Sequence, residues 1–203
     1  MHARRVRAAL PAAAVLAMLS QACATLRVPD LVPESTAAGW VEATGRAGDI
    51  AVAARPIERL EENWSLFDDD LPRLGLAAVV ITVRNSGSSE FDVGRLRIRL
   101  HSAAGRKSPA LGNEAILEAY YSGRGTRLYS VRAHEEAAKA LDRIGLRPAL
   151  LGPGGEVSGL LFFRIEPAAK EHRMRGITLA IRGFPRVNGR RPTLDLVLDN
   201  ARR

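Results

Sequence analysis

Histidine and cysteine, which carry much enzyme and metal chemistry, are few in this 203-residue chain, with four and one residues. Their spacing matches no catalytic or metal-binding motif. His134-Glu135-Glu136 begins like the helical zinc motif of metalloproteases, but Ala138 stands where the second histidine is needed. Two imidazoles therefore do not meet on one helical face. The chain also has no Gly-x-Ser-x-Gly elbow for a serine nucleophile. We predict no enzyme activity, no metal and no other cofactor.

The only cysteine, Cys23, lies where an apolar run gives way to polar sequence. Residues 1–7 carry three arginines and no acid, and residues 8–19 are uncharged, as in the first two regions of a secretory signal. The uncharged run is too short to cross a membrane, which takes about 20 apolar residues. The sequence therefore predicts export.

Two processing sites compete around this cysteine. The segment LAMLSQACAT, residues 16–25, resembles a bacterial lipoprotein signal, in which a cysteine is acylated on sulfur and becomes the new N-terminus. Small Ala22 fits that pattern, whereas Leu19 lies one position further from Cys23 than such signals usually have it. In the alternative, Ala22-Cys23-Ala24 is an A-x-A site, and cleavage after Ala24 leaves a chain without cysteine.

We expect lipidation of Cys23, because the sole cysteine is unlikely to fall in this window by chance. The resemblance implies a leader of residues 1–22 and three acyl chains on the mature cysteine. Each buried methylene contributes about 0.8 kcal/mol, so several chains give a lasting anchor. Ala24, rather than an acid, resembles lipoproteins sent to the outer membrane. The predicted location is the bacterial cell envelope, facing the periplasm, with the membrane as first partner.

The formal charge of +8 includes Arg4, Arg5 and Arg7 of the predicted leader, so the mature chain carries +5. Arginines scattered over a solvated surface account for this charge, and an exported protein has little access to nucleic acid. We predict no nucleic-acid partner.

Residues 23–47 are predicted to form the lipid anchor and a flexible tether. They show no sustained hydrophobic period and are interrupted by Pro29, Pro33, Gly39 and Gly45. The folded domain is then predicted to span residues 48–203, a length sufficient for one domain with a proper core.

Most of this domain has the period of two that is typical of β-strands. In residues 77–85, Val79, Ile81 and Val83 alternate with residues that point to the other face. Residues 157–166 are apolar on both faces, as expected of a central strand covered on each side. With the arginine-rich segment described next, at least six strands are predicted; the others lie near 49–55, 177–183 and 193–199.

Residues 95–100, RLRIRL, alternate most clearly: leucine and isoleucine make one face, and Arg95, Arg97 and Arg99 make the other. Such a row is a candidate for holding phosphate or an anionic glycan. The solvent side of one strand explains the same pattern and is the interpretation that we favour.

Between residues 113 and 146 the period changes to that of a helix, which predicts a short helical insertion. A first helix is predicted to start at Asn113 as its N-cap and to stop at Gly123. A second is predicted from Ala133 to Ile144, ended by Gly145.

Strands with turns between them, interrupted by one helical insertion, predict a mainly β domain built as an antiparallel sandwich. The segments VVITVRNSGSSEFDV, LRIRLHSAAGR and LLGPGGEVSGLLFFRI, with LDLVLD at the end, resemble immunoglobulin-like domains of exported bacterial lipoproteins. The resemblance covers about residues 48–199 apart from the insertion. It implies a fold and no activity, because those domains have varied or unknown roles.

All three tyrosines of the chain lie within ten residues, next to two arginines. Tyrosine and arginine are enriched at protein interfaces because they combine large contact area with polar ends. We therefore take as candidate partner-binding residues Tyr120, Tyr121, Arg124, Arg127 and Tyr129. The alternative is that the tyrosines seat the insertion on the sandwich.

These observations predict a membrane-anchored envelope lipoprotein that acts as a binding or accessory module, with an envelope protein as a candidate partner. One alternative is an envelope hydrolase whose carboxylates converge with His101, His134 or His172 only in the folded chain. Another is a structural subunit of an envelope complex, which would expose a large apolar patch.

Overall fold

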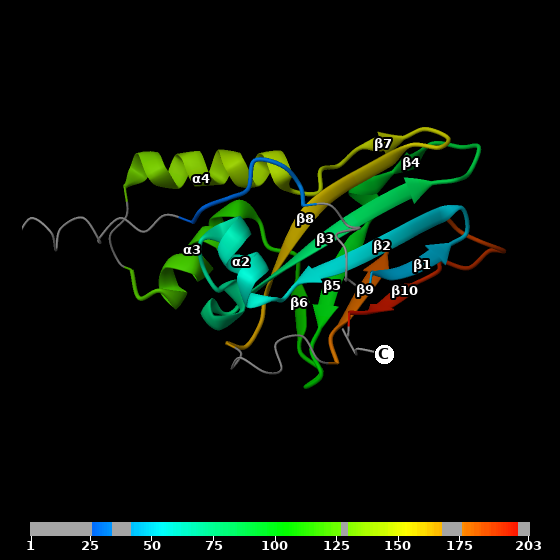
Figure 1. Cartoon of the computed structure of the whole chain (residues 1–203). Coiled ribbons are helices and arrows are strands. Elements are labelled where there is room, and N and C mark those ends of the chain that lie inside the picture. The colour runs from blue at the N-terminus through cyan, green and yellow to red at the C-terminus, as the bar shows by residue number, and fades with distance from the viewer. Residues whose placement is uncertain (1–25, 34–41, 127–129, 168–175, 199–203) are drawn as a thin grey trace, which may run out of the picture.

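Over the residues that the structure describes, the fold is mainly β, with antiparallel sheets and three α-helices (Figure 1). The structure is a computed structural model that describes residues 26–33, 42–126, 130–167 and 176–198. The helices are α2 (Leu60–Phe67), α3 (Asn113–Gly123) and α4 (Val131–Ile144). Two short 3-10 helices cover Leu71–Leu74 and Val93–Arg95.

The strands form two four-stranded sheets in which all neighbours are antiparallel. The first sheet has the order β1-β2-β3-β8, and its strands are β1 (Ala43–Ala47), β2 (Ile50–Ile57), β3 (Leu76–Asn85) and β8 (Glu156–Arg164). The second sheet has the order β10-β9-β5-β6, with β5 (Arg97–His101), β6 (Lys107–Pro109), β9 (Thr178–Arg182) and β10 (Leu194–Val197). The short strands β4 (Phe91–Asp92) and β7 (Leu150–Leu151) pair with each other.

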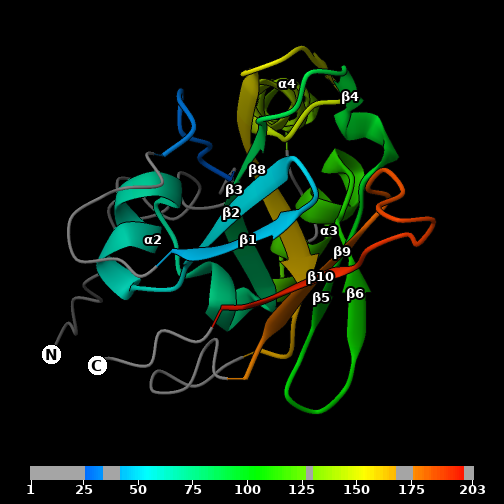
Figure 2. The same ribbon diagram turned by 90° about the vertical axis from the view of Figure 1, so that its right-hand side faces the viewer.

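The two sheets pack face to face around a core that we call the inter-sheet core. Alternate side chains of each strand point into it, because successive residues of a strand face opposite sides. The first sheet contributes Val52, Val79, Ile81, Val83 and Phe163, and the second contributes Leu100, Leu179, Ile181 and Leu196. At one side β1 and β10 come together (Figure 2), and a Cβ added at Gly45 would lie 2.5 Å from Leu194.

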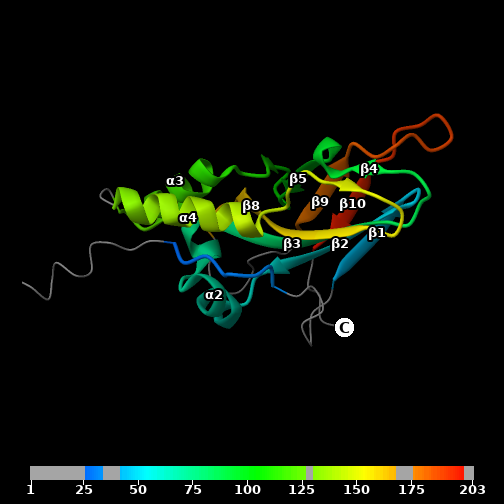
Figure 3. The ribbon, with the colours of Figure 1, turned by 90° about the horizontal axis from the view of Figure 1, so that it is seen from above.

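The opposite face of the first sheet is covered over half its length by the helices, as the view from above shows (Figure 3). Ala78, Val80, Leu160 and Phe162 point to this side, and the helices contribute Phe67, Leu117, Tyr120, Leu141 and Ile144. We call this second cluster the helix-side core. Beyond the helices, the same face of β3 continues with half-buried Thr82 and exposed Arg84. The predicted alternation of this strand is therefore confirmed.

β8 is not the central strand that its apolar pattern predicts, because it is the last strand of the first sheet. Both of its faces are nevertheless buried, one in each core. Its free edge is closed by two chain segments: the Leu111 N–H donates to the Phe162 carbonyl at 2.8 Å, and the Leu146 N–H donates to the Leu160 carbonyl at 3.2 Å. An edge strand with covered faces therefore has the same sequence pattern as a central one.

Several predicted boundaries shift in the structure. The prediction of a flexible tether is wrong for residues 43–47, which form β1. The sequence does not predict helix α2, because this helix has only eight residues and no side-chain cap. Gly112, not Asn113, is the N-cap of α3; the Asn113 side chain instead donates to Asp142 Oδ1 on α4 at 2.6 Å. Arg95 is not part of the predicted row with Arg97 and Arg99, because it lies in the 3-10 helix before β5.

Asn85, at the end of β3, connects the loop that follows this strand to the turn at residues 152–155. Its buried side-chain amide donates to the carbonyls of Ser89 at 2.7 Å and Leu151 at 2.9 Å, and its Oδ1 accepts from the Gly87 N–H at 3.0 Å. Its backbone bonds to the second turn, where the Gly154 N–H donates to the Asn85 carbonyl at 2.8 Å. One polar side chain thus holds this end of the first sheet together.

The closed edge of β8 gives a test of the fold. A Cβ at Gly159 would lie 2.4 Å from the backbone of Leu146, so Gly159→Ala forces the covering segment away from the edge. We expect the free energy of unfolding to fall by about 1–3 kcal/mol, the usual range for overpacking. Chemical denaturation measures this. The matched control is Gly152→Ala, where a Cβ meets no atom within 4 Å and little change is expected. Equal stability of the two variants would contradict the described edge.

Candidate functional site

Cys23 lies outside the described residues, but the chain that follows it is held by the domain. Leu26 is only 2% exposed and packs in the helix-side core, with Val28 and Val32 against the same cluster. Residues 26–33 run between α4 and α2 (Figures 1 and 3). Three residues of extended chain span at most about 10 Å. Cys23 is therefore within about 10 Å of a buried residue of the domain.

The predicted partner-binding cluster is largely turned inward. Tyr120 and Tyr121 are 1% and 4% exposed, and their rings meet edge to face at 5.7 Å between centroids. Both belong to the helix-side core and seat α3 on the sheet. Arg127 and Tyr129 lie outside the described residues. The partner-binding role stays a prediction, and the two described tyrosines offer little surface for it.

Arg124 connects this cluster to the segment after α2. Its Nε lies 3.0 Å from Asp69 Oδ2, and its guanidinium carbon lies 5.7 Å from the centroid of the Tyr120 ring. Burial, and then the negative charge of Asp69, raise the pKa of Tyr120, which Arg124 partly offsets. Asp69 and Asp70, which follow α2, are both buried.

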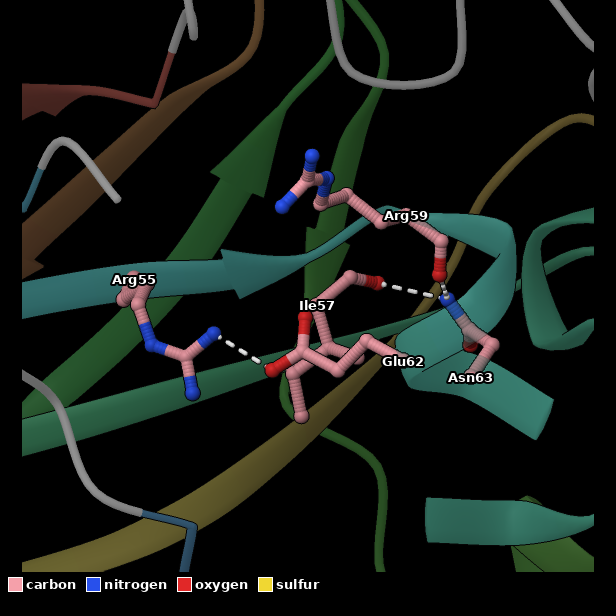
Figure 4. Close-up of polar contacts among 5 residues, drawn as sticks. All are labelled: Arg55, Ile57, Arg59, Glu62 and Asn63. Carbon is pink, nitrogen blue, oxygen red and sulfur yellow. Dashed lines mark hydrogen bonds and ion pairs between the residues drawn. The ribbon is translucent and has the colours of Figure 1, made fainter. Parts of the chain in front are cut away.

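A second buried charge, Arg55, ties β2 to α2 (Figure 4). Its side chain is fully buried, and Nη1 lies 2.6 Å from Oε1 of Glu62 in the first turn of the helix. The next residue of the helix, Asn63, donates from Nδ2 to the carbonyls of Ile57 at 3.2 Å and Arg59 at 3.0 Å. An arginine inside the apolar strand IAVAARPI, followed seven residues later by an acid, is the sequence signal for this tie.

The outer face of the second sheet carries a group of basic side chains. The exposed side chains of Arg97 and Arg99 on β5, Lys107 on β6 and Arg182 on β9 surround a shallow depression of about 260 Å³. Half-buried His101 and small Ala180 complete its lining. We call these residues the basic face. The sequence marks two of its arginines, and only the sheet pairing adds Lys107 and Arg182.

The strand register sets two arginines opposite each other on the basic face, since Arg97 pairs with Arg182. On the next pair of strands, Lys107 stands opposite His101. On the first sheet, by contrast, exposed Arg84 stands opposite Glu156. Like charges directly opposite on one face destabilise a sheet, whereas opposite charges stabilise it by about 0.2–1 kcal/mol. The pairing on the basic face is therefore unfavourable in the absence of a bound anion.

The two described histidines that a hydrolase site would need, His101 and His134, lie on different elements and do not converge. His101 lies on the basic face, whereas His134 Nε2 on α4 contacts Glu114 Oε2 on α3 at 3.0 Å. His172 lies outside the described residues. Within the described ranges, no three His, Cys, Asp or Glu side chains gather closely enough to hold a metal ion. Nor does any described helix have the length and apolar character needed to span a membrane.

Comparison with known proteins does not name a family for this chain: no family model and no curated protein matches it. Similar solved structures include the yjhA protein from Bacillus subtilis, with 12% identity, a TM-score of 0.35 and coverage of 75% of this chain and 80% of that one. A conserved hypothetical protein from Bacillus anthracis has 10% identity, a TM-score of 0.34 and coverage of 70% and 87%. These TM-scores are too low for a conclusion about shared fold or function.

The tie between β2 and α2 can be tested by neutralising its acid. Glu62→Gln removes the charge that faces fully buried Arg55, and we expect the free energy of unfolding to fall by about 3 kcal/mol, as for other broken buried pairs. Glu61→Gln, at the exposed neighbour in the same helical turn, is the control and should change stability by less than about 0.5 kcal/mol. If both variants unfold at the same denaturant concentration, the ion pair contributes nothing to the fold.

Proposed function

We propose that this protein is an exported bacterial lipoprotein, anchored through Cys23 and acting as a binding or accessory module held close to the surface of the envelope membrane. The observation that carries this proposal is the burial of Leu26 three residues after the only cysteine. A long tether would let the domain range far from the bilayer. The short link instead keeps the body of the protein within about 10 Å of its anchor.

The consequence of such an anchor is a high local concentration of the domain at the membrane. Three acyl chains give a lasting attachment, so the domain meets a membrane-bound partner by diffusion in the plane of the membrane. A short, packed link also restricts orientation, because the helix-side core, which holds Leu26, stays next to the anchor. A binding module gains affinity from both effects without any new contact.

The strand order supports an immunoglobulin-like assignment for the domain. In constant-type immunoglobulin domains the first, second and fifth strands share one sheet, and the third, sixth and seventh share the other. With β2 as the first strand, β2, β3 and β8 form one sheet in that order, and β5, β9 and β10 form the other. The helices α3 and α4 then take the place of the fourth strand.

A binding role is favoured over hydrolysis by where the polar side chains lie. The buried ones are engaged in structural ties: Arg55 with Glu62, Asn85 with two turns, and Asp69 with Arg124. On the basic face, by contrast, four exposed basic side chains surround one depression. Open, same-sign charge suits recognition of a charged partner.

Removal of the sulfur tests the anchor. Cys23→Ala abolishes the acylation site, so we expect the protein to move from the detergent phase to the aqueous phase on Triton X-114 partition of a bacterial lysate. Thr25→Ala, two residues further on, is the control and should stay with the membrane. Mass spectrometry of the N-terminal peptide from the unaltered chain should report an acylated Cys23. An unmodified N-terminus at Thr25 would overturn the proposal.

The packed link can be tested separately. Leu26→Ala removes a buried side chain, and we expect it to lower the free energy of unfolding by about 2–3 kcal/mol and to expose residues 26–33 to proteolysis. Leu31→Ala, in the same segment, is the matched control because Leu31 is 80% exposed. It should leave stability and proteolysis unchanged. Equal behaviour of the two variants would mean that the segment is a free tether.

A further inference from the structure

We propose that the basic face is a binding site for clustered phosphate groups, with Arg97, Arg99, Arg182, Lys107 and His101 as the residues that hold them. The site goes beyond the anchoring role and does not depend on acylation of Cys23. It is built by three strands of the second sheet, so the two sheets together supply a rigid platform for it.

The unfavourable register is the first reason for this assignment. Arg97 opposite Arg182, with Lys107 opposite His101 on the next pair of strands, brings three cationic side chains and an imidazole onto adjacent strands. Asp195 of β10 is paired with Ala180 and does not line the depression. A cluster of cations without an acid in its lining has high positive potential, which a multivalent anion would relieve.

The chemistry of the side chains is the second reason. Arginine offers a planar fork of donors that matches the oxygens of a phosphate, and lysine adds a compact point charge. Arg97 is partly preoriented, since its Nη1 donates to the carbonyls of Gly94 at 3.2 Å and Leu96 at 3.3 Å. Its remaining donors are available to a ligand.

The shape of the site narrows the ligand class. A depression of about 260 Å³ takes a few phosphate groups, and its open side allows a longer molecule to continue past it. Its lining contains none of the large aromatic side chains Phe, Tyr and Trp on which bases commonly stack. The geometry therefore fits phosphate groups that are recognised by their charge. These groups belong either to a soluble polyphosphate or to the head groups of anionic lipids.

A titration with inorganic tripolyphosphate tests the site. The full chain carrying Cys23→Ala is used, so that no acyl chain contributes and a failure of the anchor does not affect the result. Isothermal titration calorimetry at 50 mM NaCl should detect binding, and Arg97→Gln/Arg182→Gln should weaken it at least about tenfold. The matched control is Arg46→Gln/Arg84→Gln, which removes the same charge from exposed positions of the first sheet and should change affinity less than about twofold.

A stability measurement separates a site from general attraction to a basic protein. Because Arg97 and Arg182 repel each other, their neutralisation should raise Tm by about 1–3 °C at low salt while it abolishes binding. Tripolyphosphate should raise the Tm of the parent chain and not that of the double variant. A merely structural role would give the opposite sign in the first measurement.

Sedimentation with vesicles distinguishes the two sources of phosphate. Vesicles of phosphatidylcholine and phosphatidylglycerol in a 7:3 ratio are compared with phosphatidylcholine alone. Binding of tripolyphosphate indicates soluble phosphates, whereas binding of the mixed vesicles alone, lost in Arg97→Gln/Arg182→Gln, indicates lipid head groups. The proposal is overturned if neither probe binds, or if the control Arg46→Gln/Arg84→Gln weakens binding as much as the double variant of the basic face.

Discussion

β3 lies between two apolar cores, and most of the architecture depends on that position. One face of the strand packs on the second sheet through Val79, Ile81 and Val83. The other face packs on the helices through Ala78 and Val80. Because an apolar sheet face must be covered, α2, α3 and α4 are needed wherever β3 and β8 are apolar on both sides. The helices are thus part of the core and not an appendage to a sandwich.

Several buried polar groups of the described residues tie elements together. The Arg55–Glu62 pair holds α2 against β2, Arg124 and Asp69 join α3 to the segment after α2, and Asn85 joins two turns. Each burial removes a group from water and is tolerated because a partner is in reach. Such ties specify one arrangement of elements, which apolar packing alone does not.

The same architecture places the helix-side core and the basic face on opposite sides of the domain. The helix-side core holds the chain next to the proposed anchor, whereas the basic face lies on the outer side of the other sheet, separated from the helices by the inter-sheet core. An anchored domain of this shape keeps its charged face open while its apolar N-terminal segment is covered. Under the two proposals, attachment and recognition would use opposite sides of the domain.

The periods of two and 3.6 in the sequence predicted six of the strands, the helices α3 and α4 and the mainly β class, since each of these elements buries its own apolar face. Cys23 and the apolar run before it carry the predicted anchor, because a leader is a local signal. Residues 26–33 and β1 were missed, since Leu26 is held by distant side chains and not by a pattern of its own. The sequence marked Arg97 and Arg99, but only strand pairing brought Arg182 and Lys107 beside them. The strand register brings Arg97 and Arg182, some 85 positions apart in the sequence, opposite each other through hydrogen bonds that no local pattern encodes. The assembly of the basic face therefore depends on the tertiary structure.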